Sequence, residues 1–508
     1  MRMVCRLSVQ GHRWLFVWIF VILFSVAGCG GSGSGTSTGN TTPPGTDPPY
    51  HDVNIPGAVE WRADDFTSVI DVGPGHDVAS PCDVQWADIS ESTLIRIYWR
   101  STPYRCKWVV TAIGREDAPV VITGVPDNGR LPVITGDDAV TPAGLYYLNE
   151  DRSVLKVGNY TGAGDMDVPA FVFIENLDIR SGRPAFDFTD RYGDPASYRS
   201  NAAAVHIEEG DHITVRGCYI HDAGNGIFTS HLTRDILISG NYIYDNGIDS
   251  RIYEHNTYTE SMGIVYEYNR FGPLRTNCPG NNLKDRSAGT IIRYNWIEGG
   301  NRQLDLVETE YETFFNDPSY DETFVYGNIL IEPDGAGNSQ MIHYGGDGDD
   351  DAFYRRGVVY LYHNTLVSTR SGNTTLIRLS TDNVTADIRN NIVYTVAGAG
   401  RLALTNGHGI IHLNGNWLSR DYQYSFEAEV PDVLTEADNM TGDDPGFLDF
   451  SAREFQPANS SPCIDTAVAL TAAAADYPVD MSYAKHQSGD DRETIGSRPD
   501  VGAFESPE

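Results

Sequence analysis

The sequence predicts an all-β solenoid, in which short strands stack through successive coils. One element recurs from residue 170 onward, namely an apolar strand, an asparagine and another apolar residue, as in ISGNYIY at Asn241 and IIRYNWI at Asn295. From Asn241 the asparagines are 28, 26, 33, 36, 27 and 25 residues apart, as expected for a fixed unit with variable insertions. Each unit is rich in Val, Ile, Tyr and Thr, alternates with a period of two and ends at Gly, Asn or Asp.

The recurring asparagine has a structural explanation. An asparagine repeated at one turn position can stack from coil to coil, because each amide bonds the amides above and below it. Cys218 takes the asparagine position in ITVRGCYIHD, which otherwise matches ILISGNYIYD. The asparagines expected to form this stack are Asn176, Asn241, Asn269, Asn295, Asn328, Asn364, Asn391 and Asn416.

These repeats resemble the single-stranded right-handed parallel β-helix of the pectate-lyase-like superfamily. The segment Asp71–Ala139 is similar to the opening coils and cap of such proteins, and Asp444–Glu505 to a C-terminal segment of secreted bacterial β-helix proteins. The resemblance implies a β-helix with an N-terminal cap over residues 56–508. It leaves the chemistry open, because this fold carries lyases, hydrolases, epimerases and non-catalytic adhesins.

Residues 1–28 read as an export signal. Three arginines precede the apolar run Trp14–Val26, which is too short to span a bilayer as a stable helix. The following VAGC resembles a bacterial lipoprotein box, which implies cleavage before Cys29 and lipidation of its thiol. The alternative is an ordinary secretory signal with a chance cysteine. Gly30 after the cysteine resembles the sorting signal for the outer membrane or cell surface, and the periplasm stays open.

Residues 29–55 are predicted to be a flexible, lipid-anchored linker, because Gly30–Pro49 consists mostly of Gly, Ser, Thr and Pro. The net charge is −34, which argues against nucleic acid and against direct docking on anionic lipid. Membrane contact is therefore expected only through the anchor, and a monomer is expected. An acidic sugar would need a local basic patch.

Export permits disulfides, and Cys82 and Cys106, which are 24 residues apart, are the expected pair. The pairing of Cys218, Cys278 and Cys463 stays open.

A charged groove is expected on one strand of each coil. We aligned HNTYTES (255–261), NNLKDRS (281–287), RQLDLVE (302–308) and SQMIHYG (339–345) by their flanking asparagines. This register places Tyr258, Lys284 and Asp305 in one outward column, with Glu260 and Arg286 in the next. Ordinary solvated ion pairs are the alternative explanation. Glu260, Arg302, Gln303, His343 and Tyr344 are the expected substrate contacts.

The basic pair suggests β-elimination on an acidic, uronate-containing polysaccharide. That reaction needs a base and a group that neutralises the carboxylate as the enolate forms. Lys284 is the candidate base and Arg286 the carboxylate clamp, with Arg286 expected to lower the pKa of Lys284 where water is excluded. Tyr258 or His255 is the alternative base or acid, and His255 alone is more typical of a turn residue.

A second resemblance supports this chemistry. NLKDRSAGTIIRYNWI is similar to the segment that carries the lysine base in lyases of the family of chondroitinase B. Aligned on Arg293–Asn295, however, this chain places Arg286 at the lysine of that family. One coil later the family has an arginine, whereas this chain has Leu306 or Val307, with Arg302 four or five residues earlier.

Calcium is the candidate cofactor. Asp305 and Glu308 lie in LDLVETEYE, where Glu310 and Glu312 follow, and Gly345–Phe353 is an acidic loop. Calcium takes several oxygen ligands, which both segments could supply, although a solvated loop explains 347–351 equally well.

Other functions also fit the sequence. A glycoside hydrolase could use Asp305 and Glu308 as acid and base. A uronate epimerase shares the proton abstraction of a lyase. A non-catalytic surface protein could bind glycan on Tyr258, Tyr268 and Tyr344.

Overall fold

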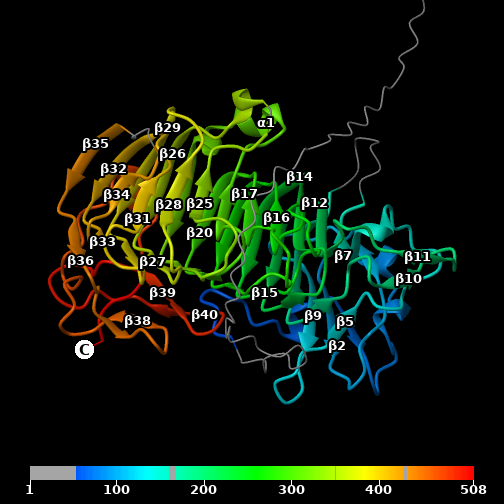
Figure 1. The fold of residues 1–508 in the computed structure, drawn as a ribbon. Coiled ribbons are helices and arrows are strands. Elements are labelled where there is room, and N and C mark those ends of the chain that lie inside the picture. The colour runs from blue at the N-terminus through cyan, green and yellow to red at the C-terminus, as the bar shows by residue number, and fades with distance from the viewer. Residues whose placement is uncertain (1–52, 160–167, 349, 428–431, 508) are drawn as a thin grey trace, which may run out of the picture. The chain divides into compact units, whose positions relative to one another are not determined.

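The computed structural model describes residues 53–507, apart from 160–167, 349 and 428–431. The signal peptide, Cys29 and nearly all of the linker expected from the sequence lie outside these residues. In the described part of the chain, short parallel strands pair from coil to coil and form three ladders (Figure 1). This arrangement confirms the predicted parallel β-helix, and the N-terminal cap stays a prediction.

Ladder 1 contains β1 (Ser68–Val72), β2 (Thr93–Tyr98), β4 (Val120–Val125), β8 (Ala170–Glu175), the second halves of β12 (Ala203–Arg216) and β14 (Asn225–Ser239), β17 (Met262–Glu267), β20 (Ala288–Arg293), β23 (Glu322–Tyr326), β26 (Gly357–Tyr362), β29 (Val384–Arg389), β32 (Ile410–Asn414) and β35 (Asp432–Ala437).

Ladder 2 contains β3 (Trp108–Val110), β7 (Ser153–Val157), the first halves of β12 and β14, β16 (Thr257–Thr259), β19 (Leu283–Asp285), β22 (Leu304–Leu306), β25 (Gln340–Tyr344), β28 (Thr374–Leu379), β31 (Leu402–Thr405) and β34 (Gln423–Ser425).

Ladder 3 contains β5 (Val133–Thr135), β9 (Asp178–Arg180), β13 (Tyr219–His221), β15 (Tyr242–Tyr244), β18 (Arg270–Phe271), β21 (Trp296–Glu298), β24 (Ile329–Glu332), β27 (Thr365–Ser368), β30 (Ile392–Thr395), β33 (Trp417–Ser419) and β36 (Met440–Gly442).

Several short strands and helices lie outside the three ladders. β6 (Ala139–Val140), β10 (Asp187–Thr189) and β11 (Pro195–Ser197) form a separate small sheet, and the pairs β37 (Phe447–Asp449) with β38 (Glu454–Pro457) and β39 (Met481–Ala484) with β40 (Ser488–Asp491) are antiparallel. The short helices are α1 (Glu312–Phe315) and α2 (Ala472–Ala475), with 3-10 turns at Ala63–Asp65, Pro81–Asp83, Trp86–Asp88, Glu150–Arg152, Pro318–Asp321 and Asp351–Phe353. None of the helices described is long and apolar enough to span a bilayer.

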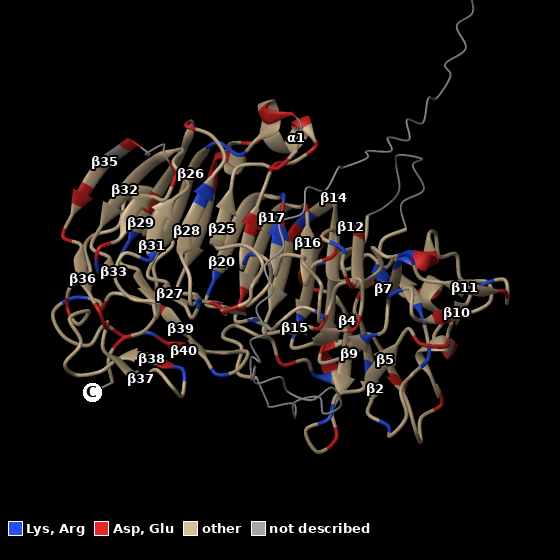
Figure 2. Cartoon of the chain, viewed as in Figure 1, with Lys and Arg blue, Asp and Glu red and all other residues tan. Residues whose placement is uncertain are grey.

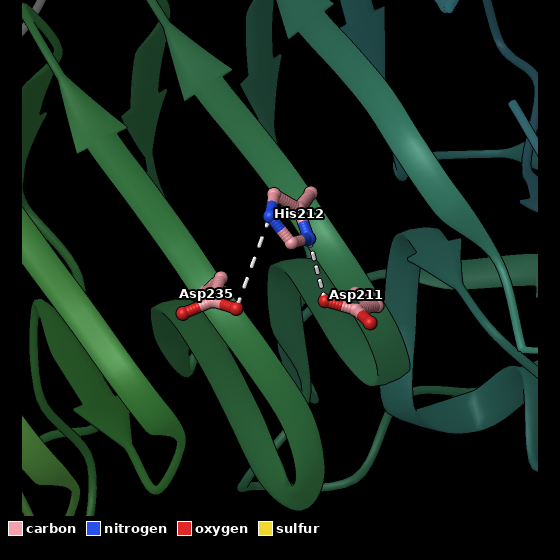
Figure 3. A group of neighbouring side chains, drawn as sticks. All are labelled: Asp211, His212 and Asp235. Atoms are coloured by element: carbon pink, nitrogen blue, oxygen red, sulfur yellow. Dashed lines mark hydrogen bonds and ion pairs between the residues drawn. The ribbon is translucent and has the colours of Figure 1, made fainter. Parts of the chain in front are cut away.

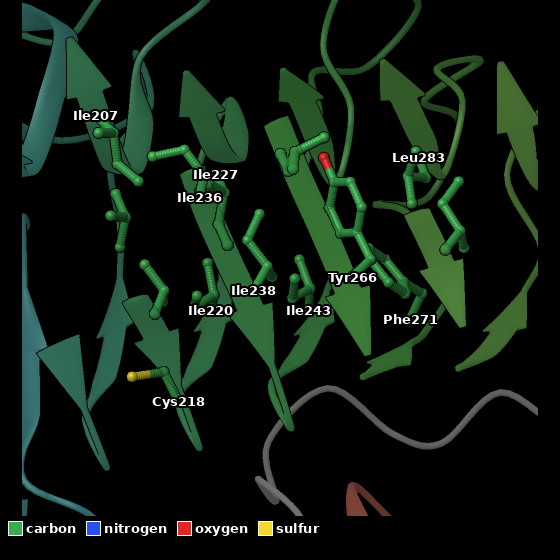
Figure 4. Packing of buried hydrophobic residues seen from close by; sticks show 14 of the residues in the cluster. Ile207, Cys218, Ile220, Ile227, Ile236, Ile238, Ile243, Tyr266, Phe271 and Leu283 are labelled. Atoms are coloured by element: carbon green, nitrogen blue, oxygen red, sulfur yellow. The ribbon is translucent and has the colours of Figure 1, made fainter. Parts of the chain in front are cut away.

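Apolar side chains fill the interior in columns that follow the strand pairing. One residue from each coil packs on the equivalent residue of the next, and the packing around Ile238 and Tyr266 is shown in Figure 4. Fully burying an aliphatic side chain contributes about 1.5–3 kcal/mol to stability. The apolar residues that alternate along each strand therefore stabilise the solenoid by filling its interior. This column consists of Ile238, Tyr266, Ile292, Val325, Leu361, Ile388 and Leu413.

The asparagines form the predicted stack. In Asn295, for example, both the backbone N–H and the Nδ2 group donate to Oδ1 of Asn328, over 2.9 and 3.0 Å. The stack includes Asn241, Asn269, Asn295, Asn328, Asn364, Asn391, Asn416 and Asn439.

Asn176 does not belong to this stack. The sequence alignment places it at the position of Asn241, but the equivalent residue is Leu177, one position later. Strand register places Leu177 opposite Cys218, and Cys218 opposite Asn241. Asn176 instead takes the preceding position, where its φ of 53° is left-handed. Asparagine tolerates that conformation better than most residues, which explains its presence there.

The C-terminal segment folds back along the solenoid. The hydroxyl of Tyr294 donates to Asp480 over 3.1 Å, and the hydroxyl of Tyr362 donates to the carbonyl of Tyr477 over 2.9 Å. The segment thereby covers the cluster of tyrosines to which Tyr294 and Tyr362 belong. Cys82 and Cys106, the pair expected from the sequence, form a disulfide. The other cysteines of the described chain, Cys218, Cys278 and Cys463, are free thiols.

Candidate functional site

The outer face of ladder 2 carries one column of polar and aromatic side chains. Backbone pairing places Tyr258 opposite Lys284, and Lys284 opposite Asp305, which confirms the register predicted from the sequence. Neighbouring members are separated by the strand spacing of about 4.8 Å. In chain order, the column consists of Lys156, His206, Phe228, Tyr258, Lys284, Asp305 and His343.

Two cavities adjoin at this column, and Phe228 and Tyr258 line both. The central cavity has a volume of about 340 Å³ and the side cavity one of about 310 Å³. The central cavity is lined by Arg152, His206, Glu208, Phe228, Thr229, Ser230, His231, Leu232, Tyr258, Glu260, Arg286, Glu310 and Tyr311. The side cavity is lined by Ser200, Asn201, Phe228, Arg251, Tyr253, Glu254 and Tyr258.

Three buried polar atoms of the central cavity have no hydrogen-bond partner within the described residues. They are Nε of Arg152, Nε of Arg286 and Nδ1 of His206. The Arg152 guanidinium, which has no ion pair in the same part of the chain, lies 5.3 Å from the centre of the Phe228 ring. These atoms lie beneath the surface, so a ligand in the cavity would meet the Nη atoms of the two guanidinium groups and Nε2 of the imidazole instead.

Arg286 is held through Nη1, and its Nη2 lies 4.0 Å from Asp347. Its Nη1 donates to the carbonyl oxygen of Glu308 over 3.0 Å and to Glu310 over 3.4 Å. The guanidinium lies 5.8 Å from the centre of the Tyr258 ring. The two guanidinium groups therefore lie beside two successive aromatic rings of the column, because Phe228 pairs with Tyr258.

Burial is the main influence on the pKa values of His206, Tyr258 and Glu260, which line the central cavity. It lowers the pKa of His206 well below the usual value, helped by the positive charges of Lys156 and Arg152, so the imidazole is neutral at pH 7. Burial raises the pKa of Tyr258, although Arg286 and Lys284 oppose it, so the phenol keeps its proton. The pKa of Glu260 is also raised by burial, against hydrogen bonds from Thr309 and the Glu310 N–H.

Lys284 does not line either cavity, and its environment differs from the one expected. Its Nζ donates to Asp305 and to Asp347, each over 2.9 Å. Burial alone would lower the pKa of Lys284, but the two carboxylates outweigh it and raise the pKa above its usual value. The predicted lowering by Arg286 is therefore wrong, and Lys284 is a fixed ammonium group poorly suited to act as a base.

His255 is also placed as a structural residue. Its Nδ1 accepts a hydrogen bond from the N–H of Asn281 over 2.9 Å. Burial lowers the pKa of His255 to about 3, so the ring is neutral. The His255 ring lies edge-on to the Tyr258 ring, with ring centres 5.4 Å apart, and lines neither cavity. His255 therefore helps to position the Tyr258 ring.

Only Glu260 among the predicted substrate contacts lines a cavity. Arg302 donates to Asp305 and Gln340, and Gln303 donates to Gly299 and Glu332. The remaining two are internal as well: His343 bonds Asp305 and Ser380, and Tyr344 belongs to the hydrophobic core.

The predicted calcium ligands do not form an open site. Asp305 already binds Lys284, Asn281 and His343 through its two oxygens, and Oε2 of Glu308 accepts from the N–H of Asp347 over 3.0 Å. These carboxylates therefore do not fit a calcium ion.

Another group of possible ligands lies on β12 and β14 (Figure 3). Nδ1 of His212 lies 2.7 Å from Asp211, and its Nε2 lies 3.9 Å from Asp235. Because opposite ring nitrogens face the two carboxylates, this arrangement is a group of polar surface contacts rather than a metal centre.

Sequence reasoning missed Arg152, His206, Glu208, His231 and Tyr311. His206 and Glu208 could have been found, since VHIEE at 205–209 aligns with the strand of Tyr258 through Phe228. Arg152 and Tyr311 lie outside the strands, in a turn before β7 and just before α1, so strand periodicity gives no signal for them.

No family model and no curated protein matches the chain. It is similar to several solved structures, among them the following three. An alginate lyase from Paenibacillus sp. str. FPU-7 is 13% identical over 68% of this chain and 99% of its own, with a TM-score of 0.45. The GH136 lacto-N-biosidase from Eubacterium ramulus is 12% identical over 74% and 68%, with a TM-score of 0.45. Pectate lyase Pel9A is 11% identical over 87% and 97%, with a TM-score of 0.41.

Proposed function

We propose that the chain is a carbohydrate-active protein, and specifically a polysaccharide lyase that cleaves a uronate-containing glycan in the central cavity. The observation that carries this proposal is the convergence there of two guanidinium groups with unpartnered Nε atoms, on Arg152 and Arg286, and a neutral imidazole, on His206. A uronate offers a carboxylate to the guanidinium groups and an acidic proton to the imidazole.

The charge of the whole protein makes these arginines informative. The net charge of −34 repels a polyanion at long range, and acidic and basic residues are interspersed along the solenoid in the view of Figure 2. Attraction of an acidic glycan therefore has to be local. Arg152 forms no ion pair within the described chain, although Glu208 and Asp151 act on its charge, and its partly buried position strengthens any bond to a carboxylate.

The proposed reaction divides the roles along the column. The rings of His206 and Tyr258 lie on either side of Phe228, with centres 5.2 and 5.3 Å from it, so a sugar resting on Phe228 contacts both. Arg152 and Arg286 neutralise the carboxylate at C5. Nε2 of His206, the ring nitrogen that is not sealed by the protein, takes the C5 proton, the electron pair forms the C4–C5 double bond, and the C4–O bond breaks. The Tyr258 hydroxyl protonates the leaving oxygen.

Arg286 and Tyr258 thus keep the roles suggested by the sequence, whereas the base becomes His206. Lys284 becomes a positioning residue. Its ammonium group lies 5.9 Å from the centre of the Tyr258 ring and is fixed there by Asp305 and Asp347.

A glycoside hydrolase is the second candidate. Glu208 and Glu260 line the same cavity, and the raised pKa of Glu260 is the property required of a general acid. A uronate epimerase would share the proton abstraction but leave the C4–O bond intact.

The test is absorbance near 235 nm, which reports the C4–C5 double bond, with uronate polymers and with calcium or chelator present. We expect wild type to give a signal, and Arg152→Gln, Arg286→Gln and His206→Gln each to lower the rate at least a hundredfold. Arg401→Gln, a change at an exposed arginine outside both cavities, is the matched control. New reducing ends without absorbance, abolished by Glu260→Gln, would instead establish the hydrolase.

Export and anchoring belong to the same proposal. We propose that the protein acts as a monomer outside the cytoplasm, tethered through Cys29 and the residues that follow. Cys29→Ser should release the protein from washed membranes into the soluble fraction, and a membrane-bound variant would contradict lipid anchoring.

A further inference from the structure

We propose that the side cavity is a second sugar subsite, which takes an uncharged ring, so that the glycan runs along the strands and presents a uronate next to an uncharged sugar. This inference rests on the proposed function, because it takes the central cavity as the uronate subsite. The reaction proposed for the central cavity does not by itself require a second subsite.

The position of the two cavities gives the direction of the glycan. Ser200 and Asn201 precede β12, and Tyr253 and Glu254 precede β16, so the side cavity lies at the start of the ladder 2 strands. The lining of the central cavity includes residues that follow these strands, such as Glu260, whereas Arg152 enters from the turn before β7. A chain that occupies both cavities therefore runs along the strands, over the shared rings of Phe228 and Tyr258.

Side chains from other coils wall the central cavity along the solenoid axis. Towards the N-terminal coils, the Arg152 guanidinium reaches to the Phe228 ring. Towards the C-terminal coils, Tyr311 stacks on His231 with ring centres 3.6 Å apart, and the Glu310 N–H donates to Glu260 over 3.3 Å. A glycan that followed the axis would meet both walls, whereas one that runs along the strands leaves through the side cavity.

The electrostatics of the side cavity differ from those of the central cavity. Nε of Arg251 lies 3.1 Å from each carboxylate oxygen of Glu254, so the charges of this pair cancel. Glu254 is fully buried and holds the pair in place. A second uronate here would have to compete with Glu254 for the guanidinium, whereas an uncharged sugar would not.

An aromatic surface supports the same conclusion. Tyr253 lines the side cavity and is 67% exposed, and although the Arg251 guanidinium lies 5.9 Å from the centre of its ring, the exposed ring surface can contact the apolar face of a sugar. Together with Tyr258 it provides stacking without charge. The preferred substrate is therefore a heteropolymer that alternates uronates with uncharged sugars, rather than a homopolymer of uronates.

The experiment compares lyase rates and binding for polymers of alternating uronate and N-acetylhexosamine with those for homopolymers of uronates. We expect the alternating polymers to give the higher kcat/KM, and Tyr253→Ala to lower it about tenfold through KM, as for loss of one aromatic contact. Tyr253→Phe should restore the rate. Tyr146→Ala, a change at another exposed tyrosine that lines neither cavity, is the control.

The outcomes separate the two proposals. Equal or faster cleavage of homopolymers, with no effect of Tyr253→Ala, would overturn the subsite while the lyase stands. Binding of alternating polymers that depends on Tyr253, without absorbance at 235 nm, would overturn the lyase while the subsite stands. Neither binding nor cleavage of any uronate polymer would overturn both.

Discussion

Lys284 and Asp305 form a buried ion pair in which Nζ and Oδ2 lie 2.9 Å apart on adjacent strands of ladder 2. Asp305 has no exposed side-chain surface, and Lys284 is 7% exposed. The pair links the floor of the groove to Asp347, which bonds the same ammonium group from the following acidic loop. Loss of either partner would therefore leave the other as a buried charge with less compensation.

Removing the ammonium group should destabilise the fold. Lys284→Met leaves Asp305 charged and buried, with Arg302, His343 and Asn281 as its remaining partners. Breaking such a pair costs about 3–5 kcal/mol. We expect this loss in the free energy of unfolding, measured by urea denaturation. The double variant Lys284→Met with Asp305→Asn should recover part of it, and no recovery would show that the two residues do not interact.

The asparagine stack should be more sensitive in its middle than at its end. Asn295→Leu removes the acceptor of the Asn269 N–H and the donor to the Tyr266 carbonyl, and leaves Nδ2 of Asn269 with only its bond to Ile238, which costs about 3 kcal/mol. Asn439→Leu is the matched control at the last link, where the side chain is only half-buried. Equal losses for the two variants, measured by urea denaturation, would contradict a cumulative role of the stack.

His255 should make stability depend on pH. Burial lowers its folded-state pKa to about 3, below an ordinary value of about 6.5, so the unfolded state binds one more proton between these limits. Its contribution to stability is therefore lost as the pH falls below about 6.5, by about 2 kcal/mol at pH 5. The test is urea denaturation of wild type and His255→Gln at pH 7 and pH 5. A variant with the same pH dependence as wild type would show that His255 is not responsible.

The fold and part of the site could be predicted from the sequence. Residues on the periodic strands were predictable, whereas residues in loops and turns were not. Tyr258, Glu260 and Arg286 lie on or next to strands whose register follows from the period of two and the asparagine positions, so their grouping was visible. The role of Lys284 was not, because its partner Asp347 is 63 residues away in a loop. Arg152 and Tyr311 reach the cavity from a turn and from a segment next to α1, where no periodicity exists.

The pH dependence of the lyase reaction distinguishes the two candidate bases. With His206 as the base, kcat/KM rises with pH through a pKa well below 6.5 and then stays level, until the Tyr258 proton is lost above pH 10. With Lys284 as the base, the rate would still be rising above pH 10, because its two carboxylate partners raise its pKa. We expect the first profile when initial rates at 235 nm are measured from pH 5 to pH 10.5. Tyr258→Phe should lower the rate and remove the alkaline limb, whereas a rate that increases up to the highest pH would return the role of base to Lys284.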